Sequence, residues 1–488
     1  MERILSALEP EEVFFWFEEV SRIPRESGKE KKISDYIVDF AKQRGLKVYQ
    51  DQQLNVIIEK NATEGYEKAK KVLLQGHMDM VCVKDDNIDH DFDKDPISLV
   101  IDGDYIKAKG TSLGADNGNA IALCLALLDS KKIKHPALQV LLTTQEETTL
   151  AGAENVDPKL LDAEYYIGLD FSKDRKLLVS CAGSSANHIT IPINRSKTEA
   201  GIVLEVKLSG LSGGHSGNDI AKNRANANVV LSEVLRQTLR IKRYRLIEIN
   251  GGRQDNVICQ SAEAKILISA SDVEEVCQKI KNSFKVQKTL YNQTDPQMEL
   301  QIKKGSSQQK VISAEDTEKI LSMITCMPDG LYALETVPEI VPITSSNLGI
   351  VRTEEEALTL DILVRSNSDA LHEEIISLIK KTACDFNARH YVDQKTLAWQ
   401  SEKNSRLIET ARRVYKKNFN ENLDTLSIHA QVEVGIILEK IKQIGRNMEA
   451  IGIGVLTYDV HSTKERVYIP SLRRTYELLC SILEALNQ

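Results

Sequence analysis

The chain has 488 residues and a formal net charge of −8, with 42% apolar and 27% charged residues. This length exceeds one ordinary domain, so we expect two. The acidic balance argues against nucleic acid as a partner, because binding to phosphates needs a basic face. The apolar stretches are too short to cross a membrane, which takes roughly 18 residues or more. The eight cysteines form no C-x-x-C pair and are too sparse for a disulfide scaffold, which indicates a reducing compartment.

The N-terminal segment, residues 1–24, has the pattern of an amphipathic helix and not that of a signal peptide, so we expect a cytoplasmic protein. Strands and helices then alternate up to about residue 190. We expect strands at NVIIEK, KVLLQG, YIKAKG, ALQVLLTT and YYIGLD, and helices over 117–130 and 156–162. KVLLQG and LQVLLTT are almost continuously apolar, which is typical of strands covered on both faces in an α/β sheet.

Residues 191–395 have a different pattern, in which strands come in close pairs and helices follow over 222–238, 272–284, 314–326 and 369–385. Two such groups succeed one another, which suggests two similar halves. After residue 396 helices and strands alternate again, and a helix over 470–487 ends the chain. We therefore predict an α/β protein with a discontinuous domain, 1–190 and 396–488, whose largely parallel mixed sheet is flanked by helices. An α+β domain, 191–395, is inserted into it.

Acidic and imidazole side chains follow three of the apolar strands. His77 and Asp79 end KVLLQG, and positions i and i+2 of an extended chain point to the same side. Glu146 and Glu147 follow ALQVLLTT, and Asp170 ends YYIGLD. Because ligands gather at the carboxyl ends of the strands in open α/β sheets, we expect these side chains to meet at one edge.

Two further groups complete the set: Asp116 in the glycine-rich loop GTSLGADNGNA, and His461 in DVHSTKERV. Taken singly, Asp116 could be a helix cap and the others ordinary surface groups. Two histidines with several carboxylates suit a pair of divalent ions, zinc first and manganese or cobalt as alternatives. One carboxylate can bridge the ions, and one of two adjacent glutamates can bind metal while its neighbour transfers protons. Asp79 can fix the tautomer of His77.

Seven segments of the chain resemble, in order, the motifs of one enzyme family. They are QGHMDMV, GTSLGADNGNA, TTQEETTLAGA, GLDFS, SGGHSGNDIAKNRANA, SIHAQVEVG and DVHSTKERV. On these motifs the chain resembles the aminoacyl-histidine dipeptidases, also called cytosol non-specific dipeptidases, within the carnosinase/aminoacylase-like dizinc peptidases. The resemblance runs nearly end to end. It implies a catalytic domain with two metal ions and a lid domain that closes over the substrate.

The resemblance also implies roles for particular side chains. The implied metal ligands are His77, Asp116, Glu147, Asp170 and His461, with Asp116 as the bridge. Glu146 resembles the general base and Asp79 the orienting acid. These roles agree with the chemistry that the residue types suggest by themselves.

In the inserted domain the resemblance implies three residues that contact the substrate: His215, Asn256 and Arg365. An arginine can hold a C-terminal carboxylate through two hydrogen bonds, and a histidine and an asparagine can donate to an oxyanion. Gln431 stands where the family has a glycine that lines the substrate site, so it either narrows the pocket or adds a hydrogen bond. His429 and Glu433, in the same motif, either shape the pocket or serve the structure.

These features predict a metal-dependent dipeptidase for dipeptides with a free N-terminus, Xaa-His or broader, with a lid that limits substrate length. One alternative is an amidase or deacylase that acts on N-acyl amino acids. Another is a catalytically silent peptide-binding regulator, against which the presence of Glu146 argues. We expect a small peptide as partner, with no nucleic acid and no membrane. The long inserted domain either forms a homodimer or mimics a partner subunit within one chain.

Overall fold

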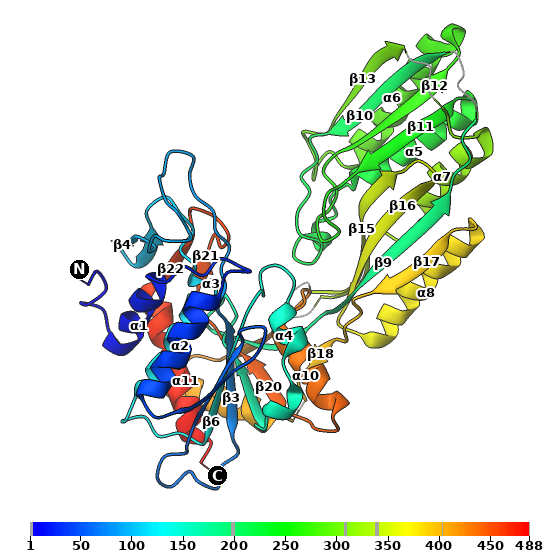
Figure 1. Cartoon of the computed structure of the whole chain (residues 1–488). Helices are drawn as coiled ribbons and strands as arrows, with labels where there is room; N and C mark the ends of the chain where they lie inside the picture. The colour runs from blue at the N-terminus through cyan, green and yellow to red at the C-terminus, as the bar shows by residue number, and fades with distance from the viewer. Residues whose placement is uncertain (1–2, 197–200, 307–309, 337–340, 403, 488) are drawn as a thin grey trace. The chain divides into compact units, whose positions relative to one another are not determined.

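The computed structural model describes the chain except for residues 1–2, 197–200, 307–309, 337–340, 403 and 488. The chain packs as two compact units (Figure 1). The first comprises 1–180, 399–427 and 432–488, and the second comprises 181–398 together with the short segment 428–431. The domain boundary expected at residue 190 falls inside a strand, Gly183–Pro192, that pairs within the sheet of the second unit.

The first unit begins with α1 (Glu11–Ser21), α2 (Lys31–Gln43), β1 (Lys47–Gln50), β2 (Val56–Lys60), β3 (Val72–His77), β4 (Leu99–Asp102), β5 (Tyr105–Ala108), α3 (Ala115–Asp129), β6 (Leu138–Thr143), α4 (Ala151–Asn155), η1 (Pro158–Leu160), β7 (Tyr165–Gly168) and β8 (Lys176–Cys181). It ends with β18 (Trp399–Gln400), α9 (Arg406–Phe419), β19 (Asp424–Ile428), α10 (Glu433–Gln443), β20 (Glu449–Gly452), β21 (Thr457–Tyr458), β22 (Arg466–Tyr468) and α11 (Ile469–Ala485).

The main sheet of this unit has the order β1-β2-β6-β3-β7-β20-β8-β18, with β19 beside β8. Its central strands β6, β3, β7 and β20 are parallel, and antiparallel pairs flank them. Every residue of β3 and of β6 is buried, as expected for parallel strands covered on both faces. The predicted mixed α/β sheet is therefore confirmed. The expected strand YIKAKG instead lies in a separate antiparallel sheet, β21-β22-β5-β4.

Helices cover both faces of the main sheet, with α1, α3 and α11 on one side and α4 and α10 on the other (Figure 1). Helix α3 approaches β3 so closely that only a glycine fits at position 76. A Cβ there would lie 2.5 Å from both the Ala120 Cβ and the Asn117 Oδ1. Gly76 thus lets the start of α3, and with it Asp116, lie against the end of β3.

The bounds predicted for one helix of the first unit are wrong. The segment 156–162 was predicted to be helical, but the structure has α4 followed by the short 3-10 helix η1. Val156 and Asp157 take extended ψ angles of 134° and 113°, which separates the two turns. The Asp157 side chain then accepts a hydrogen bond from the Lys159 N–H and caps η1.

The second unit comprises β9 (Gly183–Pro192), β10 (Ile202–Ser209), η2 (Ile220–Lys222), α5 (Ala227–Ile241), β11 (Arg245–Gly251), β12 (Ala262–Ile268), η3 (Ala270–Asp272), α6 (Val273–Leu290), β13 (Glu299–Ser306), α7 (Ala314–Cys326), β14 (Gly330–Glu335), β15 (Val341–Thr353), β16 (Ala357–Ser366), α8 (Asp369–Asp385) and β17 (Arg389–Asp393). Its antiparallel sheet has the order β13-β10-β12-β11-β15-β16-β9-β17, with β14 also beside β15.

This sheet contains the same arrangement twice. The elements β10, α5, β11, β12, α6 and β13 form a split β-α-β unit with the strand order β13-β10-β12-β11. The elements β9, α7, β15, β16, α8 and β17 repeat that order as β17-β9-β16-β15, and the first set is inserted between β9 and α7. The two halves meet where β11 pairs with β15. The two similar halves suggested by the sequence therefore share one topology.

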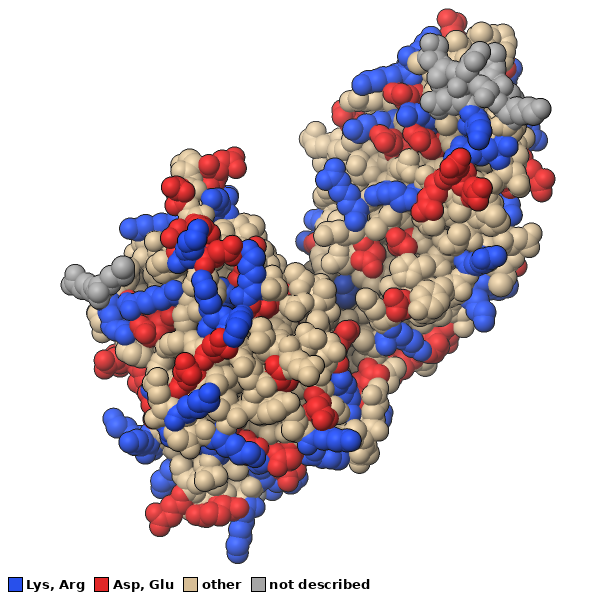
Figure 2. All heavy atoms as spheres, viewed as in Figure 1, with Lys and Arg blue, Asp and Glu red and all other residues tan. Residues whose placement is uncertain are grey.

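The surface carries charges of both signs. Figure 2 shows lysine and arginine side chains interspersed with aspartate and glutamate over the viewed face of each unit. Within the described residues, no helix combines the length and the apolar character that crossing a bilayer requires.

Candidate active site

Three parallel strands deliver the predicted residues to one edge of the first unit's sheet. β3 lies between β6 and β7, and His77 is the last residue of β3. The turn after β6 carries Glu146 and Glu147, and Asp170 follows β7 within two residues. Because the strands are parallel, these side chains meet at their carboxyl ends, as the sequence predicted.

Asp79 is a fully buried carboxylate that holds two of these segments together. Its Oδ1 lies 3.3 Å from the His77 Nδ1 and accepts a hydrogen bond of 3.1 Å from the Glu146 N–H. Its Oδ2 accepts from the Glu147 N–H at 3.2 Å and from the Ser27 hydroxyl at 2.7 Å. Burial opposes ionisation, but these donors outweigh it and lower the pKa of Asp79 to about 2.

Asp116 lies between the two histidines and turns one oxygen toward each. Its Oδ1 is 3.1 Å from the His77 Nε2, and its Oδ2 is 3.6 Å from the His461 Nε2. Asp170 lies on the side of His77, with Oδ1 3.8 Å from the same Nε2. Glu147 lies on the side of His461, where its carboxylate is 2.9 Å from Nε2. The arrangement has two lobes that share one carboxylate.

The excess of carboxylates in the cluster raises the pKa values of both histidines and so favours positive charge there. Burial disfavours the imidazolium of His77, yet Asp170 and Asp116 outweigh it and raise the pKa of His77 above its ordinary value. Hydrogen bonds to Asp116 and Glu147 raise the pKa of His461 to about 10. Burial, together with nearby carboxylates, raises the pKa of Glu146 to about 8. The carboxylates repel one another, and a cation among them would relieve the repulsion.

The donor set fits divalent metal ions. Ligand atoms of His77, Asp116 and Glu147 lie within 4.8 Å of one another, and so do those of His77, Glu146 and Asp170. Imidazole nitrogens and carboxylate oxygens are ligands that zinc and its neighbours prefer. Glu146 lies close enough to this centre to exchange a proton with a group bound there.

Glu433 is buried beneath this centre. The sequence did not decide whether Glu433 shapes the substrate pocket or has a structural role. Its Oε2 accepts hydrogen bonds from the Thr143 hydroxyl at 2.7 Å and from the Gln75 amide at 2.5 Å. The Gln75 oxygen in turn accepts from the Tyr166 hydroxyl at 2.8 Å. Burial raises the pKa of Glu433 to about 8. Glu433 therefore belongs to a buried polar network that links α10 to the ends of β3 and β6.

In the second unit the structure brings the predicted substrate residues together. His215 forms an isolated bridge with Val257, and the Ser216 N–H donates to the Asn256 carbonyl at 2.8 Å. Arg365 lies on β16, and its Nε donates to the Ser216 hydroxyl at 3.3 Å. His215, Asn256 and Arg365 are thus neighbours, although more than 100 residues separate the first from the last.

The tautomer of His215 follows from its hydrogen bonds. Its Nδ1 accepts from the Gly217 N–H at 3.1 Å and from the Asn218 N–H at 3.2 Å. Burial, reinforced by the charge of Arg365, lowers the pKa of His215 to about 4. The ring is therefore neutral near pH 7 and carries its proton on Nε2, which makes that atom a hydrogen-bond donor.

Arg365 is a buried guanidinium, 7% exposed, and among the described residues none forms an ion pair with it. Burial lowers its pKa to about 10, and Asp255 acts on it only at longer range. Ser184 is its partner across β9 and β16, and the Ser184 hydroxyl donates to the Gln431 Oε1 at 2.7 Å. Gln431 therefore belongs to the surroundings of Arg365, and its amide nitrogen remains a donor.

His429 anchors the segment that carries Gln431. Its Nε2 lies 2.7 Å from the Ser345 hydroxyl and its Nδ1 lies 3.1 Å from the Asn367 Oδ1. Burial lowers the pKa of His429 to about 3, so the ring is neutral. These contacts favour the structural reading of His429 that the sequence left open.

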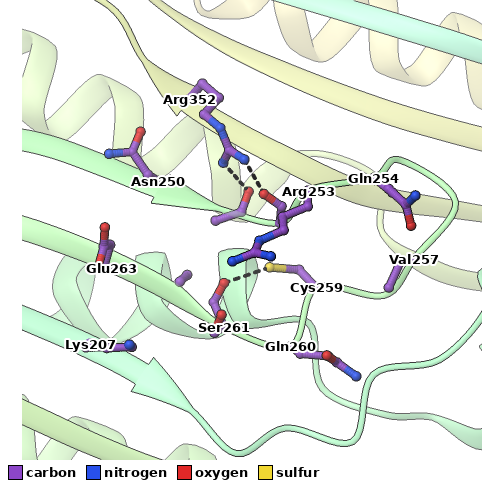
Figure 3. A pocket seen from close by; sticks show the side chains of 13 residues that line it. Lys207, Asn250, Arg253, Gln254, Val257, Cys259, Gln260, Ser261, Glu263 and Arg352 are labelled. Carbon is purple, nitrogen blue, oxygen red and sulfur yellow. Dashed lines mark hydrogen bonds between the residues drawn. The ribbon is translucent and has the colours of Figure 1, made fainter. Parts of the chain in front are cut away.

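A separate cavity of about 840 Å³ lies on the second unit, beside the loop that carries Asn256 (Figure 3). Its lining contains none of the predicted site residues. Arg352, one of its charged lining residues, donates to the carbonyls of Gly251 and Gly252 and so holds the loop.

Sequence reasoning missed several residues that form hydrogen bonds to the backbone or the side chains of the site. Arg25, Ser27 and Glu465 contact the segments that carry the acids. Ser184 donates to Gln431, and Ser216 accepts from Arg365. Arg25 and Glu465 do stand in segments that match the family, VSRIPRESGKE and DVHSTKERV. Ser216 follows His215 within the motif SGGHSGNDIAKNRANA, so that motif could have pointed to it. Ser184 lies outside the family motifs, and a buried serine has no pattern of its own.

Comparisons with known proteins show the family to which the chain belongs. Residues 73–485 match the model of the family described as Peptidase family M20/M25/M40. The chain is 31% identical over 481 residues to a cytosol non-specific dipeptidase of Escherichia coli, and 98% of each chain is covered. An aminoacylhistidine dipeptidase from Vibrio alginolyticus has a similar crystal structure, with a TM-score of 0.85, 30% identity and coverage of 99% of this chain and 98% of that one. A tripeptidase from Staphylococcus aureus shares the fold at 17% identity, with a TM-score of 0.60 and coverage of 98% and 99%.

The family match and the fold are those of a hydrolase of peptide bonds. The chain belongs to peptidase family M20/M25/M40. Membership implies divalent metal ions, for which the two groups of side chains described above are candidate ligands. The resemblance, the fold class and the enzyme class predicted from the sequence are confirmed.

Proposed function

We propose that this metal-dependent dipeptidase binds two divalent ions in the two lobes of its acidic cluster, with zinc first and manganese or cobalt as alternatives. One lobe would use His77 and Asp170, the other Glu147 and His461, and Asp116 would bridge them. The observation that carries the proposal is the orientation of Asp116, whose two oxygens face different histidines at 3.1 Å and 3.6 Å. A carboxylate shared in this way is what a binuclear centre requires.

Bound ions would supply a water of lowered pKa and polarise the scissile carbonyl. Glu146 would take the proton from the attacking water and return it to the leaving amine. Burial, and after it the surrounding carboxylates, raise the pKa of Glu146 to about 8, which favours a group that takes up a proton. Asp79 would keep His77 and the 146–147 turn in place, because it bonds to both.

The second unit would act as the lid, and its side chains would recognise the peptide. The neutral His215 offers its Nε2–H to the oxyanion of the tetrahedral intermediate, and Asn256 offers its amide. A neutral donor suits this role, since it stabilises developing charge without forming an ion pair with the substrate beforehand.

Arg365 would bind the C-terminal carboxylate of the dipeptide. Burying a guanidinium without an ion-pair partner costs desolvation free energy. A substrate carboxylate would offset that cost through two parallel hydrogen bonds. Gln431 would add a third donor, because its oxygen is already engaged by Ser184 while its amide nitrogen is not. This supports the reading in which Gln431 adds a hydrogen bond to the substrate site.

A substrate panel under defined metal tests the proposal. Protein stripped by a chelator is assayed with Xaa-His and other dipeptides, with their N-acetylated forms and with N-acyl amino acids, after addition of zinc, manganese or cobalt. We expect hydrolysis only with metal, and only of substrates with a free amine. Faster cleavage of N-acyl amino acids would favour a deacylase, and full metal occupancy without turnover would favour a regulator.

The relative's name and the composition support a cytoplasmic location, which a fractionation experiment can test. A homodimer stays a prediction. Sedimentation of the purified chain gives its mass in solution. The mass of a dimer would support the homodimer, and the mass of a monomer would support the alternative, in which the doubled sheet of the second unit takes the place of a partner.

A further inference from the structure

The loop that carries Asp116 is held by one buried carboxylate. Glu465, 3% exposed, accepts hydrogen bonds from four successive backbone N–H groups. Its Oε2 accepts from Leu113 at 2.8 Å and Gly114 at 2.9 Å, and its Oε1 accepts from Ala115 at 2.8 Å and Asp116 at 3.3 Å. Both oxygens are therefore saturated by the turn that presents the bridging carboxylate.

Glu465 follows His461 by four residues, in the turn between β21 and β22. The same short segment thus supplies one imidazole of the cluster and clamps the loop that supplies the shared carboxylate. His461 itself has a positive φ of 62°, so its backbone conformation depends on the turn around it. The clamp links two parts of the chain that are about 350 residues apart in sequence, as the Ala115 contact shows.

Arg25 holds the same loop from the side of β3. One of its guanidinium nitrogens donates to the carbonyls of Met78 and Asp79, both at 3.1 Å, and the other donates to the Gly114 carbonyl. Gly114 has a φ of 68°, and a Cβ there would lie 2.5 Å from the Arg25 Nη2. The loop is therefore packed tightly between a buried cation and a buried anion.

We propose that Glu465 is a positioning residue that sets the distance between Asp116 and His461, and so forms the lobe these two share with Glu147. The inference rests on the proposed binuclear site. Glutamine cannot replace Glu465 in this role, because one of its two terminal groups is an NH₂ that would face two N–H donors. The loop would then lose half of its anchor, and the Asp116 Oδ2 would no longer be held toward His461.

Zinc binding to the metal-free full chain tests the proposal. Wild type, Glu465→Gln and a matched control, Glu477→Gln, are titrated with Zn²⁺ against a coloured chelator, and bound zinc is counted after equilibration at a buffered free concentration. Glu477 is an exposed carboxylate on α11, so the Glu477→Gln variant should bind zinc as the wild type does. We expect two zinc ions in wild type and control. In E465Q we expect one of the two to bind about 10–100-fold more weakly, the usual cost of removing a group that orients a ligand.

The pattern of loss separates positioning from general instability. Weakening confined to one ion supports the proposal, and equal weakening of both ions, or of neither, overturns it. If the circular dichroism spectrum of E465Q differs from that of the wild type, Glu465→Asp is tested by the same criterion. This variant keeps the charge on a shorter side chain, so its zinc affinity should fall less, and at the same ion. Fewer than two ions in the wild type would overturn the binuclear site itself, and this inference with it.

Discussion

Replacement of Asp79 by asparagine should separate the positioning of the site from its charge. The carboxylate receives donors at both oxygens, from His77 and Glu146 at Oδ1 and from Glu147 and Ser27 at Oδ2. An asparagine keeps one oxygen and presents an NH₂ at the other position. The less costly orientation turns the NH₂ toward Ser27, whose hydroxyl can rotate to accept, and leaves the Glu147 N–H without an acceptor.

The expected magnitude follows from that one lost acceptor. A buried donor left unsatisfied costs about 1–3 kcal/mol, so Asp79→Asn should lower the free energy of unfolding by about that amount. Because the 146–147 turn loses its anchor, kcat/KM should fall about 10–100-fold at saturating metal. The pKa of Asp79 is lowered to about 2, so the wild-type group is ionised throughout the assay range and the ratio of the two rates should not change with pH.

The assay combines urea unfolding of the metal-free chain with dipeptide hydrolysis between about pH 5 and 8, the range in which maximal stability usually falls. Ser27→Ala is the matched control, because it removes one donor and leaves the carboxylate, so its effects should be smaller in both measurements. The reasoning is refuted if Asp79→Asn keeps wild-type kcat/KM, or if the control loses as much activity as the variant does.

Three further predictions concern catalysis, recognition and acid stability. Glu146→Gln should lower kcat by about 10²–10⁴ with zinc stoichiometry unchanged by metal analysis, since it removes proton transfer; normal turnover would contradict the assigned base. Arg365→Gln should raise KM for dipeptides but not for their C-terminal amides, and an equal rise for both would argue against a carboxylate partner. Burial lowers the pKa of His372 to about 4, below its ordinary 6.5, so the unfolded chain takes up the proton first as the pH falls. The resulting stabilisation is complete above pH 6.5 and is lost as the pH falls toward 4, by up to about 3 kcal/mol. In His372→Gln the plot of unfolding free energy against pH should lose the slope that corresponds to the uptake of one proton in this range. An unchanged slope would show that His372 does not cause the loss.

The sequence predicts the site best where a regular element positions the side chain. His77 and Asp170 follow apolar strands, and parallel pairing of β3 with β7 brings such strand ends together without further information. Asp116 lies at the start of α3, where its ψ of 103° is not helical, and His461 lies in the turn between β21 and β22. No apolar strand ends at either position, so the sequence suggested both as ligands but not how they lie relative to each other. Their spatial relation depends on Glu465 and Arg25, which bind backbone atoms, and backbone contacts leave no periodic pattern in a sequence.

Domain organisation illustrates the same limit. The helices over 314–326 and 369–385 have the predicted bounds; a serine side chain caps the N-terminus of each, and the apolar periodicity runs through each helix. The assignment of 428–431 to the second unit could not be predicted, since it arises from His429 bonding to Ser345 and Asn367. Four residues carry no composition signal, and their contacts are with residues far away in the chain, among them Ser345, Asn367 and Ser184.

The doubled sheet of the second unit has a consequence for protein engineering. The segment from β10 to β13 is a complete cassette, inserted between β9 and α7, and it covers part of one edge of β15. Excising it would leave a remainder with the full strand set of one half but with unpaired N–H and C=O groups along β15. Such an exposed edge attracts another strand, so the shortened protein should self-associate where the intact chain satisfies its own edge.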